Sequence, residues 1–269
     1  MTSNRRPRFT DKVVIVTGAG SGIGMATARY FLTEGASVVL NGRRRGRLET
    51  AAQGFDPEKV LLHDGDVSDA DYIQRLIDGT VARFGAIDVL VNNAGIEVLG
   101  PMTHISIEDF NRVISTNLNG VFFAIRAALP HLLKSRGSVI NVSSTSGLRG
   151  DTFASPYNAS KGGVSNLTRS LALELGMQGV RVNAVNPVLI SDTDMSRYAL
   201  GNAHLREKFM DRIPLGRSGE LREVAGVIAF LASEEASFIN GVNLPIDGGM
   251  SASSGTPNGA SALAELGLA

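Results

Sequence analysis

The stretch Thr17–Gly24 (TGAGSGIG) joins two segments of different hydrophobic periodicity. Before it, Lys12–Thr17 (KVVIVT) is a short apolar run that predicts a buried strand, and after it Ile23–Glu34 carries apolar residues at helical spacing. Glycines in such a turn leave backbone N–H groups and the positive end of the helix open to a phosphate, because no Cβ blocks the approach. The spacing is G-x-x-x-G-x-G, inside a βαβ unit of about 30 residues. The stretch therefore predicts a dinucleotide site, with contacts at Gly18, Ser21, Gly22, Ile23 and Gly24.

Short β-rich runs alternate with longer helical patterns along the rest of the chain. Further predicted strands are Ala36–Asn41, Lys59–His63, Ile87–Val91, Ser138–Ser143, Val180–Val185 and Val242–Ile246. Most of these runs are continuously apolar, as expected for strands that are covered on both faces. The alternation predicts an α/β fold with a Rossmann-like, doubly wound parallel sheet of seven strands.

Helical patterns fill the intervals between these strands. Asp69–Phe84 has apolar residues at helical spacing, with Ser68 and Asp69 as candidate N-terminal caps. Ile107–Leu133 and Pro156–Met177 are longer and rich in small and apolar residues, so we expect both to be well buried.

A single domain covers the chain from residue 10 to residue 250, because no linker divides it. Residues 251–269 are expected to form a C-terminal tail, and their low-complexity part Ser251–Ala260 (SASSGTPNGA) is expected to be mobile. The polar and mixed segment Asp192–Arg217 is expected to be a helical insertion between two strands, where a substrate lid is common.

The composition excludes several classes of protein. The chain has 269 residues and a formal net charge of zero, which argues against a nucleic-acid partner. It has no cysteine, and its four histidines lack metal-ligand spacing, so no metal site is expected. No apolar run approaches the ~20 residues that span a bilayer, and the N-terminus has no secretory apolar segment. A cytoplasmic enzyme without a membrane partner is the expectation.

The residues after the second predicted strand bear on the choice of nicotinamide cofactor. NAD sites usually place an acidic residue there to bind the ribose 2′-hydroxyl. Here the stretch is Asn41–Arg45 (NGRRR), with three arginines and no acid. An arginine such as Arg43 can bind a 2′-phosphate bidentately, which favours NADP, with NAD as the alternative. The arginines could instead be the solvated start of a helix.

Tyr157–Lys161 (YNASK) places a tyrosine and a lysine four residues apart on a predicted helix, so their side chains share a face. The pair occurs together with the glycine turn, with Asn92–Gly95 (NNAG) and with Ser143 and Ser144. In this combination and order the sequence resembles the short-chain dehydrogenase/reductase family, in its single-domain branch of 3-oxoacyl-carrier reductases and secondary-alcohol dehydrogenases. The resemblance covers about residues 10–250.

The resemblance implies an NAD(P)-dependent oxidoreductase that acts on a small carbonyl or alcohol substrate, and it implies a homotetramer. The family's catalytic positions fall on Asn117, Ser144, Tyr157 and Lys161, with Ser144 preferred to Ser143 because of its spacing from the tyrosine. The cofactor positions that it implies, besides the glycine turn and Arg43, are Asp66, Val67, Asn93, Ala94, Gly95, Tyr157, Lys161, Pro187, Ile190 and Thr193.

The tyrosine–lysine pair also has a chemical argument of its own. Carbonyl reduction needs a hydride from the nicotinamide and a proton donor aimed at the oxygen. A free tyrosine has a pKa near ~10, and an ammonium ~4.5 Å away favours phenolate by roughly 3–4 kcal/mol. We therefore expect Lys161 to bring the pKa of Tyr157 towards ~7. Ser144 would hold the substrate oxygen, and Asn117 would position a water that relays protons through Lys161.

The chain departs from the family pattern after the sixth predicted strand. The glycine that commonly follows Pro187 is Val188, and the threonine at Thr193 comes one position late. Either Thr193 or Ser191 then supplies the hydroxyl near the carboxamide. Glu97 follows the NNAG motif and has two interpretations, a substrate contact to a hydroxyl or cation and a solvated loop residue.

Three alternative functions remain open. A sugar epimerase or dehydratase uses the same tyrosine–lysine pair but generally has a larger C-terminal substrate region. Enoyl reductases of similar fold space the two residues by seven, not four, which disfavours that class. A catalytically silent dinucleotide sensor or scaffold would have no need for all four catalytic groups.

Overall fold

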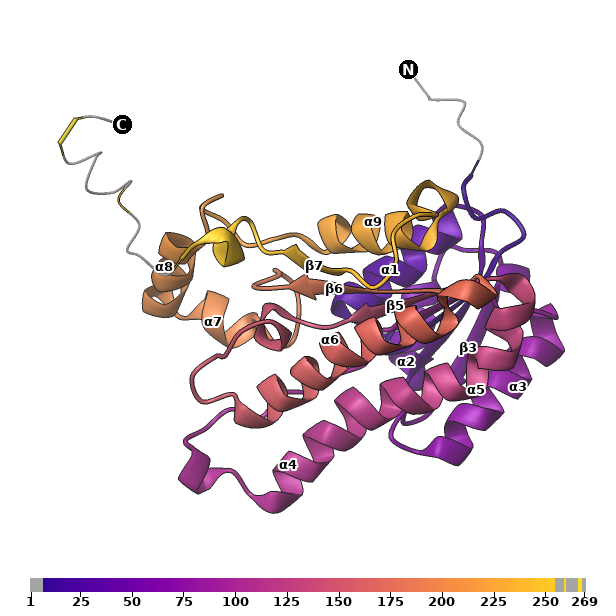
Figure 1. The fold of residues 1–269 in the computed structure, drawn as a ribbon, viewed down its shortest axis with the longest axis horizontal. Coiled ribbons are helices and arrows are strands. Elements are labelled where there is room, and N and C mark those ends of the chain that lie inside the picture. Colours follow the sequence, from indigo (N-terminus) through magenta and orange to yellow (C-terminus); the bar gives the residue numbers. More distant parts are fainter. Residues whose placement is uncertain (1–6, 255–258, 260–265, 268–269) are drawn as a thin grey trace.

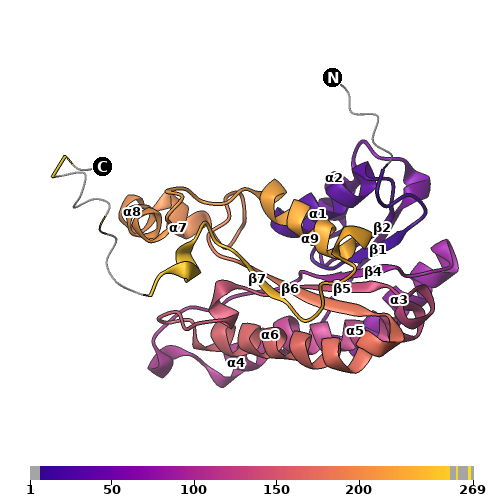
Figure 2. The ribbon, with the colours of Figure 1, turned by 45° about the horizontal axis from the view of Figure 1, so that its top comes forward.

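The computed structural model describes residues 7–254, 259 and 266–267. Its centre is a parallel sheet of seven strands in the order β3-β2-β1-β4-β5-β6-β7 (Figures 1 and 2). The strands are β1 (Val13–Val16), β2 (Ser37–Gly42), β3 (Val60–Asp64), β4 (Val89–Asn92), β5 (Ser138–Val142), β6 (Arg181–Pro187) and β7 (Asn243–Ile246). All seven predicted strands are confirmed, and so is the doubly wound, Rossmann-like architecture.

Helices cover both faces of the sheet, and Figure 2 shows the three layers edge-on. One face carries α1 (Gly22–Thr33), α2 (Arg45–Ala52) and α9 (Leu221–Ala232). The other carries α3 (Ala70–Phe84), α4 (Ile107–Ile114), α5 (Gly120–Ser135) and α6 (Ser155–Leu175). Two short helices, α7 (Arg197–Gly201) and α8 (Ala203–Arg212), extend beyond the sheet after β6 (Figure 1).

The continuous apolar strands are explained by two cores, one on each face of the sheet. Val14 and Val16 pack into the core under α1 and α9, whereas Ile15 packs into the core under α3 and α5. Successive strand residues point to opposite faces, so a strand covered on both sides needs apolar residues at every position.

The helix predictions are partly confirmed and partly corrected. Asp69 is the N-cap of α3, and its carboxylate accepts from the backbone N–H groups of Asp71 and Tyr72. The expectation of one well-buried helix over Ile107–Leu133 is wrong. A π-helical turn at Ser115–Asn119 separates α4 from α5, and in α4 only Val113 is buried.

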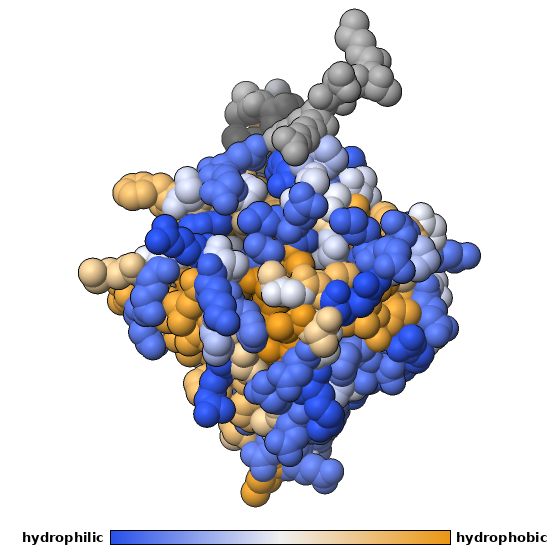
Figure 3. All heavy atoms as spheres, turned by 90° about the vertical axis from the view of Figure 1, so that its right-hand side faces the viewer, coloured by the Kyte–Doolittle hydropathy of each residue, from blue (hydrophilic) through white to orange (hydrophobic). Residues whose placement is uncertain are grey.

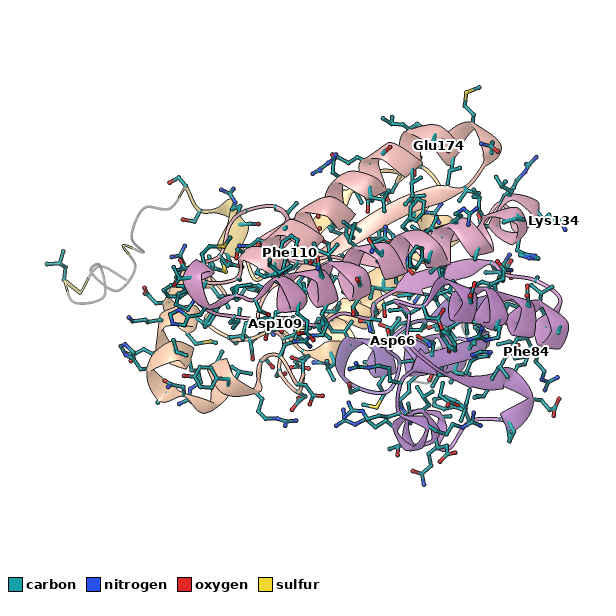
Figure 4. All side chains as sticks on the ribbon, turned by 90° about the horizontal axis from the view of Figure 1, so that it is seen from below. Asp66, Phe84, Asp109, Phe110, Lys134 and Glu174 are labelled. Carbon is teal, nitrogen blue, oxygen red and sulfur yellow. The ribbon has the colours of Figure 1, made fainter. Side chains whose placement is uncertain are left out.

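Figure 4 shows α5 and α6 side by side, with Lys134 and Glu174 near their C-terminal ends and Asp109 and Phe110 on α4. The exposed side chains on these helices include apolar ones, such as Phe122 on α5 and Leu173 on α6. The expectation that Pro156–Met177 is well buried therefore holds for one side of α6 only.

The structure adds two helices, α2 and α9, that were not predicted, and it places α7 and α8 within the predicted insertion. Most of the predicted C-terminal tail lies outside the described residues. In the described part of the chain, no helix is long and apolar enough to cross a membrane, and no group of His, Cys, Asp or Glu could hold a metal ion.

The carboxyl ends of the strands meet at one edge of the sheet, beside α7 and α8. The strand order reverses between β1 and β4, which is where open α/β sheets bind ligands. Figure 3 shows the opposite end of the molecule, where hydrophilic side chains surround patches of apolar ones. We call the edge at the carboxyl ends of the strands, around β1 and β4, the switch-point edge. It holds the glycine turn, the NNAG loop and the loop after β5.

Candidate active site

The glycine turn between β1 and α1 is closely packed against the NNAG loop. Gly18 has a φ of +66°, and a Cβ on it would lie 2.9 Å from the Cα of Ala94. A Cβ on Gly24 would lie 2.3 Å from the carbonyl oxygen of Gly18 and 2.4 Å from Nδ2 of Asn93. These contacts leave room only for glycine, and the N-terminus of α1 faces the opening above the turn.

The NNAG loop is fastened to this turn by hydrogen bonds. Nδ2 of Asn93 donates to the carbonyl of Thr17 at 2.9 Å, and the Thr17 hydroxyl accepts from the N–H groups of Asn93 (2.9 Å) and Ala94 (3.1 Å). The turn and the loop are therefore one rigid unit, although they are more than 70 residues apart in sequence.

The three consecutive arginines after β2 point in different directions. Arg43 lies 4.0 Å from the carboxylate of Asp66, at the end of β3, and both side chains are exposed at the switch-point edge. Arg44 lies 4.0 Å from Asp194, in the insertion after β6. Arg45 turns away and bonds to Glu49 (3.3 Å) and Asp64 (3.2 Å). Only Arg43 and Arg44 therefore remain beside the cofactor groove.

Asp194 was not predicted as part of the site, and it links the insertion to α2. Its carboxylate accepts from Arg47 at 3.0 Å and from Arg197 at 2.7 Å, in addition to the longer contact with Arg44. The hydrogen bond from Arg47 lowers the pKa of this carboxyl. The pairs with Arg47 and Arg44 join residues about 150 positions apart, so no local sequence pattern indicates them.

Tyr157 and Lys161 lie on the first turns of α6, as the four-residue spacing predicts. Nζ of Lys161 lies 5.6 Å from the centroid of the Tyr157 ring and donates a 2.8 Å hydrogen bond to the carbonyl of Val142. The lysine side chain is buried. A Cβ on Gly95 would come within 3.5 Å of the ammonium, so the NNAG loop closes over it.

The direction of the Tyr157 pKa differs from the expectation. Burial raises the pKa of Tyr157 to about 12, although a hydrogen bond with Ser144 lowers it, and the carboxylates of Glu97 and Asp151 raise it further. Burial also lowers the pKa of Lys161 to about 8. In this arrangement the pKa of Tyr157 moves away from neutral pH, contrary to the expectation, because burial disfavours the charged phenolate and two nearby carboxylates add to this cost.

The two serines after β5 have separate surroundings. Ser143 donates to the carbonyl of Lys161 at 3.1 Å and shares a 2.8 Å hydrogen bond with Ser165, so it fastens β5 to α6. Ser144 instead faces Tyr157, and its hydroxyl also bonds to Ser146 at 3.1 Å. Ser146 in turn donates to the carboxylate of Asp151, a contact that the sequence did not indicate. This arrangement favours Ser144 as the residue beside the reacting group.

Asn117 lies in the π-helical turn, a type of distortion that is frequent at functional sites. Its Oδ1 accepts from the N–H of Ile96 and its Nδ2 donates to the carbonyl of the same residue, both at 2.8 Å. Nδ2 also donates to Ser160 at 3.0 Å. The side chain therefore holds the loop against α6, and its role in positioning a water stays a prediction.

The segment after β6 closes the other side of the groove. A Cβ on Gly22 would lie 3.4 Å from Cγ2 of Thr193, so Thr193 lies over the glycine turn. Ser191 points elsewhere and donates to the carbonyl of Gly219 at 3.2 Å. The Thr193 hydroxyl is itself bonded to Ser196 at 2.8 Å, so of the two residues left open by the sequence Thr193 is favoured by its position and not by a free hydroxyl.

The residues fit a nicotinamide dinucleotide. The turn forms a cradle that a Cβ at Gly18 or Gly24 would disturb, and helix α1 directs its N-terminal N–H groups into it. Asp66 and Val67 lie at the end of β3, on the side of the groove where an adenine would bind. Pro187, Ile190 and Thr193 lie on the side of Tyr157, where the nicotinamide would bind.

Comparison with known proteins supports the same picture. The family model described as "Enoyl-(Acyl carrier protein) reductase" matches residues 18–251. The chain is 45% identical over 250 residues to the meso-2,3-butanediol dehydrogenase of Serratia marcescens, covering 93% of this chain and 98% of that protein. It is 42% identical over 247 residues to a 3-oxoacyl-[acyl-carrier-protein] reductase of Thermotoga maritima, covering 90% of this chain and 99% of that protein.

Solved structures agree in fold. The crystal structure of levodione reductase has a TM-score of 0.86 at 38% identity, with 91% of this chain and 100% of that chain covered. A glucose/ribitol dehydrogenase from Brucella melitensis, described as a short-chain dehydrogenase/reductase, has a TM-score of 0.87 at 36% identity, with 91% and 99% covered.

Proposed function

Because the chain belongs to the short-chain dehydrogenase/reductase family, we propose that it uses Tyr157 as acid and base in hydride transfer between NADP(H) and a secondary alcohol or ketone. The protein is an NAD(P)-dependent oxidoreductase that acts on CH–OH or C=O groups. The observation that carries the proposal is the meeting of Tyr157, Ser144 and buried Lys161 beside the glycine turn.

Each residue has a role that follows from its surroundings. When bound, the nicotinamide supplies or accepts the hydride. In reduction, the phenol of Tyr157 donates its proton to the carbonyl oxygen, and in oxidation the phenolate takes the hydroxyl proton. The hydroxyl of Ser144 binds the same oxygen and holds it beside Tyr157. Lys161 provides a buried positive charge under the tyrosine ring, and Asn117 is a positioning residue that fixes the NNAG loop.

The proposal includes NADP as the preferred cofactor, with NAD as the alternative. Arg43 and Arg44 lie at the groove, and no acidic residue follows β2 directly in the sequence. The carboxylates of Asp66 and Asp194 lie 4.0 Å from these arginines, so a 2′-phosphate would compete with them for the guanidinium groups. The ion pairs of Asp194 with Arg44 and Arg47 are consistent with an anion-binding role for the arginines at this edge.

We expect the double substitution Arg43→Ala and Arg44→Ala to raise the KM for NADPH by about 10- to 100-fold, the effect of losing one or two charge-assisted hydrogen bonds. The KM for NADH should stay within about threefold, because NADH has no 2′-phosphate. Arg45→Ala is the matched control, since Arg45 is bonded to Glu49 and Asp64 on the other side of α2. Steady-state kinetics with both cofactors measure the effect. A wild-type preference for NADH, or an equal rise for both cofactors, would contradict the NADP assignment.

The pH dependence should differ between the two directions of the reaction. With the pKa of Tyr157 raised to about 12, the phenol is protonated throughout the neutral range. The phenolate fraction then rises tenfold per pH unit, so we expect kcat/KM for alcohol oxidation to rise about tenfold between pH 6 and pH 7, and again to pH 8. Reduction uses the protonated form and should change less than about twofold. Lys161 loses its own proton around pH 8, at the top of this range, since its pKa is about 8. An oxidation rate that is flat or falls over this range would contradict the role of Tyr157.

The alternatives are disfavoured by particular features. A silent dinucleotide sensor would not need Tyr157, Ser144 and Lys161 together. The four-residue spacing of Tyr157 and Lys161 argues against enoyl reduction, and the named relatives include a butanediol dehydrogenase and a levodione reductase, which act on alcohol or ketone groups. The proposal further includes one domain over residues 10–250, a cytoplasmic location and a homotetramer. The exposed apolar side chains of α5 and α6 support such an assembly.

A further inference from the structure

Glu97 is placed at the active site by a rigid segment of backbone. It follows Ile96, whose N–H and carbonyl are both bonded to the amide of Asn117 at 2.8 Å. Gly95, two positions earlier, lies against the ammonium of Lys161. The backbone on the N-terminal side of Glu97 is therefore fixed relative to the catalytic residues.

The carboxylate of Glu97 is half-buried, and within the described ranges of the chain it has no hydrogen bond or ion pair. Burial raises its pKa. Glu97 lies two positions after Gly95, which contacts Lys161 under the Tyr157 ring, and its charge accordingly raises the pKa of Tyr157. A partly buried carboxylate without a donor is unfavourable, and a ligand that brings a donor relieves this cost.

The other charged groups near Tyr157 restrict which ligand can do so. The second carboxylate that acts on the phenol is Asp151, which already accepts from Ser146. The buried cation is Lys161, which already donates to Val142. A substrate carboxylate would be repelled by both carboxylates. A substrate ammonium would be attracted by them and repelled by Lys161, and it would also lose its hydration on entering the site. A neutral hydroxyl can donate to Glu97 without repulsion and at a smaller desolvation cost.

We propose that Glu97 is a specificity-determining residue that accepts a hydrogen bond from a second hydroxyl group next to the reacting carbon. The preferred substrates are then vicinal diols and, in the reverse direction, the corresponding α-hydroxyketones. This inference rests on the proposed function, because the first hydroxyl or carbonyl is the one that Tyr157 and Ser144 engage.

The test compares two alcohols that differ by one hydroxyl, 2,3-butanediol and 2-butanol, in NADP⁺-dependent oxidation by the full-length protein. For the wild type we expect a higher kcat/KM for the diol. Glu97→Ala should lower the ratio of the two kcat/KM values by about 10- to 100-fold, the loss of a hydrogen bond to a charged acceptor. Glu97→Gln keeps an acceptor without the charge and should lower the ratio by less.

Asp151→Asn is the matched control, because it removes the other negative charge that acts on Tyr157. This variant should change kcat/KM for both alcohols by the same factor, so that the ratio of the two values stays unaltered. A Glu97→Ala variant whose ratio of kcat/KM values equals that of the wild type, with both values lowered equally or both unchanged, would overturn the inference. Preference for 1-amino-2-propanol over the diol would also overturn it. If the wild type oxidises neither alcohol and reduces no ketone, the proposed function itself fails, which is a distinct result.

Discussion

Tyr157→Phe should reduce kcat by about 100-fold or more, towards the ~10⁴-fold upper range of general acid–base catalysis. The substitution removes only the hydroxyl group. The ring keeps its place beside Lys161, whose ammonium lies 5.6 Å from the ring centroid. Ser144 can still bind the substrate oxygen, but no group remains in position to exchange its proton. Steady-state kinetics give kcat, and NADPH fluorescence gives the dissociation constant of the cofactor, which should stay within about threefold.

Tyr30→Phe is the control for the loss of a tyrosine hydroxyl elsewhere in the fold. Tyr30 lies on α1 and accepts a 2.9 Å hydrogen bond from Arg8, away from the site. This variant should keep the wild-type kcat. If Tyr157→Phe retained more than a few per cent of the wild-type kcat, another group would have to exchange the proton, and the assignment of Tyr157 would be wrong.

Gly24→Ala should remove NADPH binding and lower the free energy of unfolding by about 1–3 kcal/mol, the range for overpacking a close-packed site. The added methyl group would lie 2.3 Å from the carbonyl oxygen of Gly18 and 2.4 Å from Nδ2 of Asn93. Neither atom can yield easily, because Asn93 also bonds to Thr17 and so fastens the NNAG loop to β1. Urea unfolding and NADPH titration of the same sample measure both effects.

Gly46→Ala is the matched control for this glycine substitution. Gly46 lies in α2, and a Cβ on it would have nothing within 4 Å. Alanine is the better helix former, so this variant should be neutral or more stable by up to about 1 kcal/mol, with unchanged NADPH binding. If Gly24→Ala were as stable as Gly46→Ala and bound NADPH normally, the glycine turn would not be the tight cradle that the structure describes.

The sheet was predictable because each strand carries its own signal. Val14, Ile15 and Val16 are all apolar because both faces of β1 are covered, and this property shows in the sequence as a continuous run. Helix α2 was not predicted, since only Leu48 and Ala51 of its eight residues are buried and it has little apolar periodicity. Helix α9 was not predicted either. It begins with a capping box made by Glu220 and Glu223, so the serine or threonine that usually indicates a helix start is absent there.

Only the parts of the candidate site that belong to sequence motifs could be predicted. Spacing alone places Tyr157 and Lys161 on one face of α6, and the resemblance supplies the pairing with Ser144. The pKa of Tyr157 depends on how much solvent the surrounding loops exclude, which no spacing gives. The ion pairs of Asp194 with Arg44 and Arg47 join distant segments, so they emerge only when the chain is folded.

We claim that this chain transfers a hydride to a carbonyl carbon, and the path of the hydride can be followed with an isotope. The protein is incubated with NADPH deuterated at C4 of the nicotinamide, using both stereoisomers in separate reactions, and with acetoin as the ketone. Mass spectrometry of the product then locates the label. We expect deuterium on the newly formed carbinol carbon of 2,3-butanediol from one stereoisomer only, and none with Tyr157→Phe. Cofactor that binds but transfers no label to acetoin or to any other ketone would contradict the claim and would favour a dinucleotide-binding protein without turnover.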